Sequence, residues 1–99
     1  MRAEYEKRVR DLAAVAERMR RDGADAETIA RTVVAERRAL AAHYKEMTPE
    51  PLRTRIFAHT VAVYSDPLGP TVDYLRGKGR SWEEIIASAS RPGEIPVED

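Results

Sequence analysis

The sequence predicts a small all-α domain, a bundle of about five helices that begins with a long antiparallel helical hairpin. Charged residues make up 34% of the 99 residues, and the hydrophobic 42% is in large part alanine, which is typical of helices with narrow apolar stripes. Apolar residues recur every three or four positions in the N-terminal half. Glycines, prolines and capping residues divide the C-terminal half into short segments.

The first predicted helix covers residues 2–21. Its apolar residues are spaced four, three, four and three apart, as in a heptad seam: Tyr5, Val9, Leu12, Ala16 and Met19. Gly23 then supplies a left-handed stop. Because this seam offers a long apolar edge, a homodimer formed by a second copy of the chain is one predicted partner state.

The second predicted helix covers about 26–46, with Asp25 as its cap and Glu27 in its first turn. Its main apolar stripe contains Ile29, Val33, Leu40, Tyr44 and Met47. Glu36 and Arg37 interrupt that stripe. The short connection at Gly23 predicts that the two long helices form the antiparallel hairpin.

A third helix is expected to open at Thr48-Pro49-Glu50-Pro51, with Thr48 as its cap and both prolines in its first turn. Its apolar residues give it a broad hydrophobic surface: Leu52, Ile56, Phe57, Val61, Val63 and Tyr64. This breadth predicts that it is the most buried helix of the domain. A β-strand over 61–64 is the alternative.

The stretch "SDPLGPT", residues 65–71, fits a type I turn followed by a helix cap. Asp66, Pro67 and Gly69 occupy the first, second and fourth turn positions, where these residue types are preferred. Thr71 caps a short helix over 72–76.

The segment 77–79, Gly-Lys-Gly, ends that short helix, and Ser81 with Glu84 forms a capping box for a last helix through about Ser90. Arg91-Pro92-Gly93 ends it. The predicted domain is therefore 1–93, and 94–99 is predicted to be a flexible acidic tail.

Composition narrows the function classes. The 17 Lys and Arg residues balance the 17 Asp and Glu residues, so net charge does not drive binding to nucleic acid or anionic lipid. The chain has no cysteine, which removes disulfides and thiolate chemistry. Its apolar runs are too short to span a membrane, and the N-terminus lacks the apolar core of a signal peptide. No membrane association and no cofactor is expected.

His43 and His59 are the two histidines, and they lack the spacing of a helical metal pair, so no metal site is predicted. His59 is the candidate acid or base of a metal-independent nuclease, in which imidazole moves a proton and guanidinium stabilises phosphorane charge. The candidate catalytic set is His59, Arg55, Tyr64 and Asp66. The alternatives are a surface histidine and an aspartate that caps its own turn.

Three arginines are candidate binding residues: Arg37, Arg38 and Arg53. Arg37 and Arg38 interrupt an apolar stripe, where an arginine either contacts an anion or pairs with a nearby carboxylate such as Glu36 or Glu17.

The predicted helix, glycine turn and helix of residues 71–90 resemble a DNA-binding helix-turn-helix. The second helix begins Trp82-Glu83-Glu84, however, and two carboxylates at positions that face the groove repel phosphate. DNA binding is therefore a lesser alternative, and Trp82 is expected to anchor the core.

Two long stretches, "IARTVVAERRALAAHYKEMTPEPLRTRIF" and "YSDPLGPTVDYLRGKGRSWEEIIASASRPG", resemble a module at the C-terminal ends of bacterial polymorphic toxins of the Rhs and haemagglutinin types. The resemblance covers roughly residues 3–93 and departs from the family pattern at His59, Thr60 and Ser65. It implies a bacterial effector context, either cytoplasmic or exported without a signal peptide of its own. It also implies a protein partner, an immunity or a delivery protein.

Two functions follow as expectations. The first is a non-enzymatic helical protein-interaction module associated with a toxin system. The alternative is a small metal-independent nuclease toxin, and nucleic acid is an expected partner only in that case.

Overall fold

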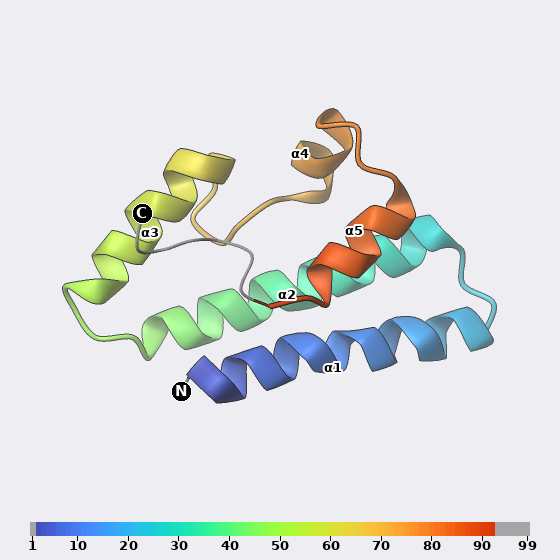
Figure 1. Ribbon diagram of the computed structural model, residues 1–99, viewed down its shortest axis with the longest axis horizontal. Helices are drawn as coiled ribbons and strands as arrows, with labels where there is room; N and C mark the ends of the chain where they lie inside the picture. Colours follow the sequence, from blue (N-terminus) through green and yellow to red (C-terminus); the bar gives the residue numbers. More distant parts are fainter. Residues whose placement is uncertain (1, 93–99) are drawn as a thin grey trace.

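The computed structural model describes residues 2–92, and this part of the chain is all-α, as predicted (Figure 1). The helices are α1 (Arg2–Arg21), α2 (Ala26–Glu46), α3 (Leu52–Tyr64), α4 (Val72–Gly77) and α5 (Trp82–Ala89). Residues 61–64 belong to α3, so the alternative of a strand there is wrong.

The core lies where α1, α2 and α5 meet. α1 and α2 run antiparallel as the predicted hairpin, and α5 packs against both of them (Figure 1). The largest side chains with no exposed surface are Val9, Ile29, Val33 and Ile85. Leu12 and Ala16 of the predicted seam are also buried within the single chain, so much of the seam already has an intramolecular partner. The homodimer stays a prediction.

Local signals in the sequence produce the predicted helix ends. Gly23 has a φ of 91°, the left-handed conformation that ends α1. The Asp25 carboxylate accepts a hydrogen bond from the Thr28 N–H at 2.8 Å. Ser81 forms the complete capping box of α5 with Glu84.

The start of α3 differs from the prediction, because Thr48 is not its cap. The Thr48 hydroxyl instead donates to the carbonyl of Tyr44 at 2.9 Å, which closes the end of α2. α3 begins after Pro51, and the Glu50 carboxylate accepts hydrogen bonds from the Thr54 N–H at 3.1 Å and the Thr54 hydroxyl at 2.6 Å. A carboxylate thus takes the place expected of the threonine hydroxyl.

The burial predicted for α3 is also wrong. Only Thr60 is buried on this helix, and Leu52, Val61 and Val63 are 43–44% exposed. Figure 1 shows α3 near the C-terminal end of α2, away from α5. Its apolar residues are spread around most of the helix circumference, so no single neighbouring surface covers them all.

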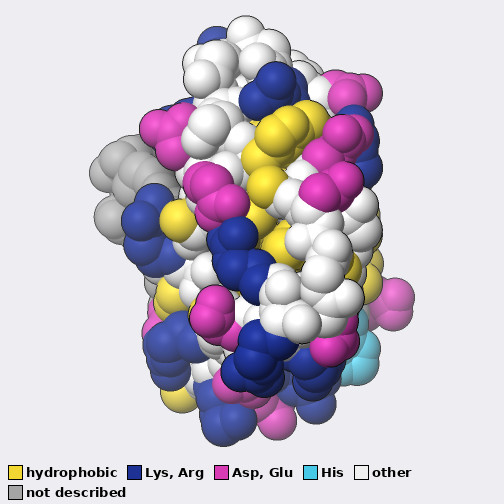
Figure 2. Space-filling model, turned by 90° about the vertical axis from the view of Figure 1, so that its right-hand side faces the viewer, with side chains coloured by type: hydrophobic (Ala, Val, Ile, Leu, Met, Phe, Trp, Pro, Cys, Tyr) yellow, Lys and Arg dark blue, Asp and Glu magenta, His cyan; other side chains and the backbone are white. Residues whose placement is uncertain are grey.

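The surface elsewhere carries both signs of charge. In Figure 2, which views the end of the molecule with the α1–α2 turn, basic and acidic side chains alternate around a narrow hydrophobic strip. No helix within residues 2–92 is long and apolar enough to cross a bilayer. The predicted acidic tail, 94–99, lies outside the described residues.

Candidate functional site

The turn predicted at residues 66–69 connects α3 to α4. The Gly69 N–H donates to the Asp66 carbonyl at 3.3 Å, and the Leu68 N–H donates to the Asp66 carboxylate at 2.8 Å. Gly69 has a φ of 103°, a conformation that favours glycine. Asp66 therefore stabilises its own turn, as aspartate commonly does at this position.

Arg38 fastens this turn to α2. Its guanidinium donates to both carboxylate oxygens of Asp66, at 3.1 and 3.2 Å, and to the Gly69 carbonyl at 2.9 Å. The two charged side chains are only about a quarter exposed, at 25% and 26%. The hydrogen bonds from Arg38 and from the Leu68 N–H hold the pKa of Asp66 below its ordinary value. We call this contact the Arg38–Asp66 clasp.

Arg37 binds the C-terminal end of α5. One of its nitrogens lies 2.7 Å from the Ser88 carbonyl, 3.0 Å from the Arg91 carbonyl and 3.3 Å from the Ala89 carbonyl. The Ser88 carbonyl also accepts the Arg91 N–H at 3.2 Å. A cation at this end of α5 adds a donor to the last carbonyls and complements the helix dipole. This contact explains why an arginine interrupts the apolar stripe of α2. Arg37 and Arg38 therefore bind α5 and the 66–69 turn, and not the carboxylates of Glu36 or Glu17 that the sequence suggested.

Two tyrosines join α4 to the end of α3. The rings of Tyr64 and Tyr74 meet edge to face with centroids 5.5 Å apart. The Tyr74 hydroxyl donates to the Val63 carbonyl at 3.2 Å. Tyr64 thus has a packing contact beside the clasp.

The remaining candidate residues lie along α3 or just before it. Arg53 pairs with Glu50 at 3.1 Å, while Arg55 is exposed. His59 is half-buried, and its Nε2 is enclosed without a hydrogen-bond partner. The structure therefore brings Arg38 and Asp66 together, but it gives no hydrogen bond that joins the His59 Nε2 to the other catalytic candidates.

His43, the other histidine, is exposed and lies edge-on against Tyr44, with ring centroids 5.0 Å apart. Across residues 2–92 no group of three or more His, Asp or Glu side chains is placed to hold a metal ion.

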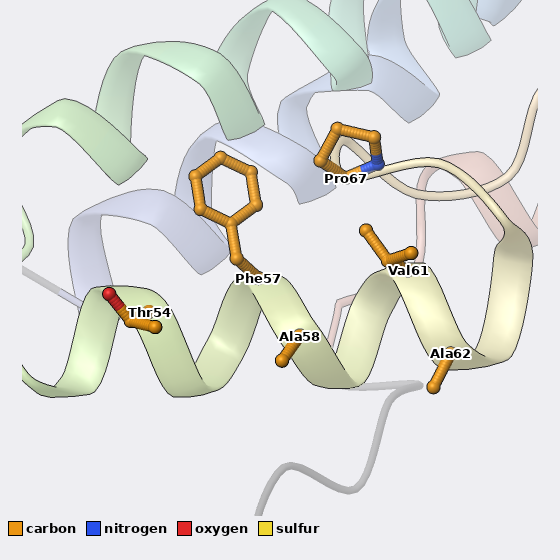
Figure 3. Close-up of a pocket in the computed structure, with 6 residues that line it drawn as sticks. All are labelled: Thr54, Phe57, Ala58, Val61, Ala62 and Pro67. Atoms are coloured by element: carbon orange, nitrogen blue, oxygen red, sulfur yellow. The ribbon is translucent and has the colours of Figure 1, made fainter.

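The surface of α3 carries an open apolar depression (Figure 3). Its lining is Thr54, Phe57, Ala58, Val61, Ala62 and Pro67. Phe57 and Val61 point toward the side where Pro67 lies, as Figure 3 shows. The Lys45 ammonium lies 3.4 Å from the centroid of the Phe57 ring, a cation–π contact at the border of the depression. We call the exposed side of α3 with this depression the α3 face.

The α3 face does not follow from residue type alone, because the apolar residues of α3 are spread around most of its circumference. At 100° per residue, positions 54, 58, 61 and 62 lie together, whereas position 56 lies on the far side. The spacing groups these positions, and the structure shows that they line a depression.

In the segment 71–90, which resembles a helix-turn-helix, the two glutamates at the start of α5 make contacts within the chain. Glu83 forms a two-pronged ion pair with Arg20, and the shared capping box occupies Glu84. Trp82 packs against the core as predicted, with the guanidinium of Arg76 4.3 Å and that of Arg31 5.5 Å from its ring centroid.

Comparison with known protein families, with curated proteins and with solved structures gave no match.

Proposed function

We propose that this chain is a non-enzymatic helical protein-interaction module, that the α3 face is its docking surface, and that its partner is an immunity or delivery protein of a bacterial polymorphic toxin system. The toxin context rests on the resemblance of the two long motifs. The docking role rests on one observation, which is that apolar side chains of α3 remain exposed, Val61 among them.

Exposed apolar side chains along one helix are a recognised basis for protein recognition. Val61 is 44% exposed, and Ala58 and Ala62 beside it are exposed as well. Contiguous apolar patches on small proteins mark interaction sites, because covering them removes apolar surface from water at roughly 25 cal/mol per Å². Anchors spaced three, four and seven residues apart are the pattern by which one helix docks against another surface.

The neighbouring polar residues support a structural role for the clasp. Asp66 receives three hydrogen bonds from its own turn and from Arg38. A carboxylate engaged in this way is a poor proton acceptor, since the same contacts lower its pKa. The environment of Asp66 therefore favours the interaction module over the nuclease, in which Asp66 would be a catalytic residue.

One observation favours the nuclease as a second candidate. Arg55 and His59 are one helical turn apart on α3, a spacing that brings a guanidinium and an imidazole to the same side of a helix. Metal-independent cleavage of RNA needs that pair beside a phosphate.

Site-specific photocrosslinking tests the module. A photoreactive amino acid replaces Ala58 on the α3 face, and the matched control places it at Ala14, which is exposed on α1. We expect one protein to crosslink at position 58 in the native cell and to form a stoichiometric complex when both purified chains are mixed. Equal crosslinking at positions 58 and 14, or no complex on mixing, contradicts the module.

A second assay addresses the nuclease. Residues 1–99 are produced alone in the bacterial cytoplasm, with His59→Ala as the comparison. The module predicts normal growth and intact RNA. Growth arrest with RNA cleavage that persists in chelator, and that His59→Ala removes while the variant stays folded, favours the nuclease and contradicts the module.

A further inference from the structure

We infer that the α3 face selects a partner helix whose apolar stripe is bordered on both sides by carboxylates. This inference rests on the proposed function and adds the chemistry of the partner. It follows from the position of the charges around the α3 face.

α3 is basic in a chain that is neutral as a whole. Its 13 residues include Arg53 and Arg55 and no Asp or Glu, whereas the complete sequence has 17 residues of each sign. Glu50 neutralises Arg53 from the preceding turn. Arg55 is exposed and pairs with no carboxylate among the described residues. Within residues 2–92, Arg55 is thus a cation of α3 that can meet a charge on a partner.

Two cations border the apolar stripe. At 100° per residue, the stripe formed by positions 54, 58, 61 and 62 lies between Phe57 on one side and Arg55 on the other. Lys45 places its ammonium against Phe57, 3.4 Å from the ring centroid. The arrangement is therefore cation, apolar stripe, cation. Its electrostatic complement is an apolar stripe between two rows of carboxylates.

A second copy of this chain does not provide that complement. Two α3 helices packed against each other would bring four cationic borders together. Glu50, the carboxylate just before α3, is already engaged by Arg53 and Thr54. Like charges across an interface are unfavourable. A polyanion such as RNA would meet the cations but leave the apolar stripe uncovered. A separate acidic helix satisfies both features.

Two synthetic helical peptides probe this selectivity. They share one stripe of Leu and Ala, and the positions beside the stripe are Glu in one peptide and Lys in the other. Binding to the ¹⁵N-labelled chain is followed by the amide shifts of Ala58, Val61 and Ala62. We expect the Glu peptide to bind about tenfold more tightly, as two exposed charge pairs of typical strength would give.

Charge exchange provides the control. Arg55→Glu is expected to abolish or reverse the tenfold preference, while Arg10→Glu, an exposed arginine of α1, is expected to leave it unchanged. A preference that survives Arg55→Glu contradicts the assignment of Arg55 to the border.

The other outcomes separate the inference from the proposed function. Equal binding of both peptides at the α3 face overturns the acidic selectivity and leaves the docking surface intact. No shift of the α3 amides with either peptide overturns the docking surface as well. Concentration-dependent shifts of the same amides without peptide make a second copy the occupant. Shifts with a short single-stranded RNA but neither peptide make nucleic acid the occupant. Both of these last results overturn the inference.

Discussion

Replacing Arg38 by methionine tests whether the clasp holds the 66–69 turn on α2. Methionine keeps an unbranched apolar stem of similar reach but removes all the guanidinium hydrogen bonds. The Asp66 carboxylate is then held by the Leu68 N–H alone, and the Gly69 carbonyl loses its arginine partner.

The magnitude follows from the charge and the burial of the pair. A hydrogen bond to a charged group contributes about 1.5–3 kcal/mol, whereas a fully exposed ion pair contributes at most about 1 kcal/mol. Arg38 and Asp66 are about one quarter exposed and share two of the three hydrogen bonds. We expect Arg38→Met to lower the free energy of unfolding by about 2 kcal/mol. For a domain of this size the melting temperature then falls on the order of 10 °C.

Urea unfolding followed by circular dichroism at 222 nm measures this loss, with Asp66→Asn as the matched variant. Asparagine still accepts the Leu68 N–H, so Asp66→Asn is expected to cost less than Arg38→Met. Because both variants break the same contact, their effects should not add in the double variant. Additive losses, or a loss below about 0.5 kcal/mol for Arg38→Met, would refute the clasp.

The clasp also has a pH signature. Folding lowers the pKa of Asp66, so its contribution to stability is present above the unfolded pKa of about 3.9 and is lost as the pH falls through the lower folded pKa. The stability difference between the wild type and Arg38→Met should therefore be constant near neutrality and shrink only below about pH 4. A difference that disappears between pH 5 and pH 7 would contradict this assignment.

Three further predictions concern the fold. Ile85→Ala should lower the free energy of unfolding by about 3 kcal/mol in urea titrations, because Ile85 has no exposed surface; a loss under 1 kcal/mol would place it outside the core. Gly69→Val should cost about 1–2 kcal/mol from its φ of 103° alone, since nothing lies within 4 Å of an added Cβ; an unchanged melting temperature would contradict that backbone conformation. Thr71→Ala should remove the hydrogen bond from the Tyr74 N–H at 3.0 Å and cost about 1 kcal/mol, with Thr71→Ser retaining most of it; equal losses in the two variants would argue against the cap.

Local sequence signals were sufficient for most helix boundaries. Gly23, Asp25 and Thr71 act within a few residues of themselves, so their roles follow from residue type and spacing alone. The heptad spacing of α1 similarly predicted buried residues such as Val9 correctly.

Contacts between distant residues were beyond such reasoning. Arg38 pairs with Asp66, 28 residues away, and Arg37 reaches the end of α5 more than 50 residues away. The partner of a long flexible side chain depends on which groups lie near it in the folded chain, and a single sequence does not show which groups these are. The prediction that α3 is buried was wrong for a related reason. An apolar helix is buried only where another element packs against it, and the core formed by α1, α2 and α5 covers only part of α3.

One pair of variants tests most directly whether the α3 face is a docking surface. Val61→Ser changes an exposed valine of α3, and Val34→Ser makes the same change at a valine of α2 that is 6% exposed. Urea unfolding and complex formation with the partner crosslinked at position 58 are measured for both. We predict that Val61→Ser weakens the complex at least tenfold while the stability changes by less than about 0.5 kcal/mol, and that Val34→Ser lowers the stability by about 2 kcal/mol. If Val61→Ser costs as much stability as Val34→Ser, or leaves the complex unchanged, the α3 face is not a docking surface.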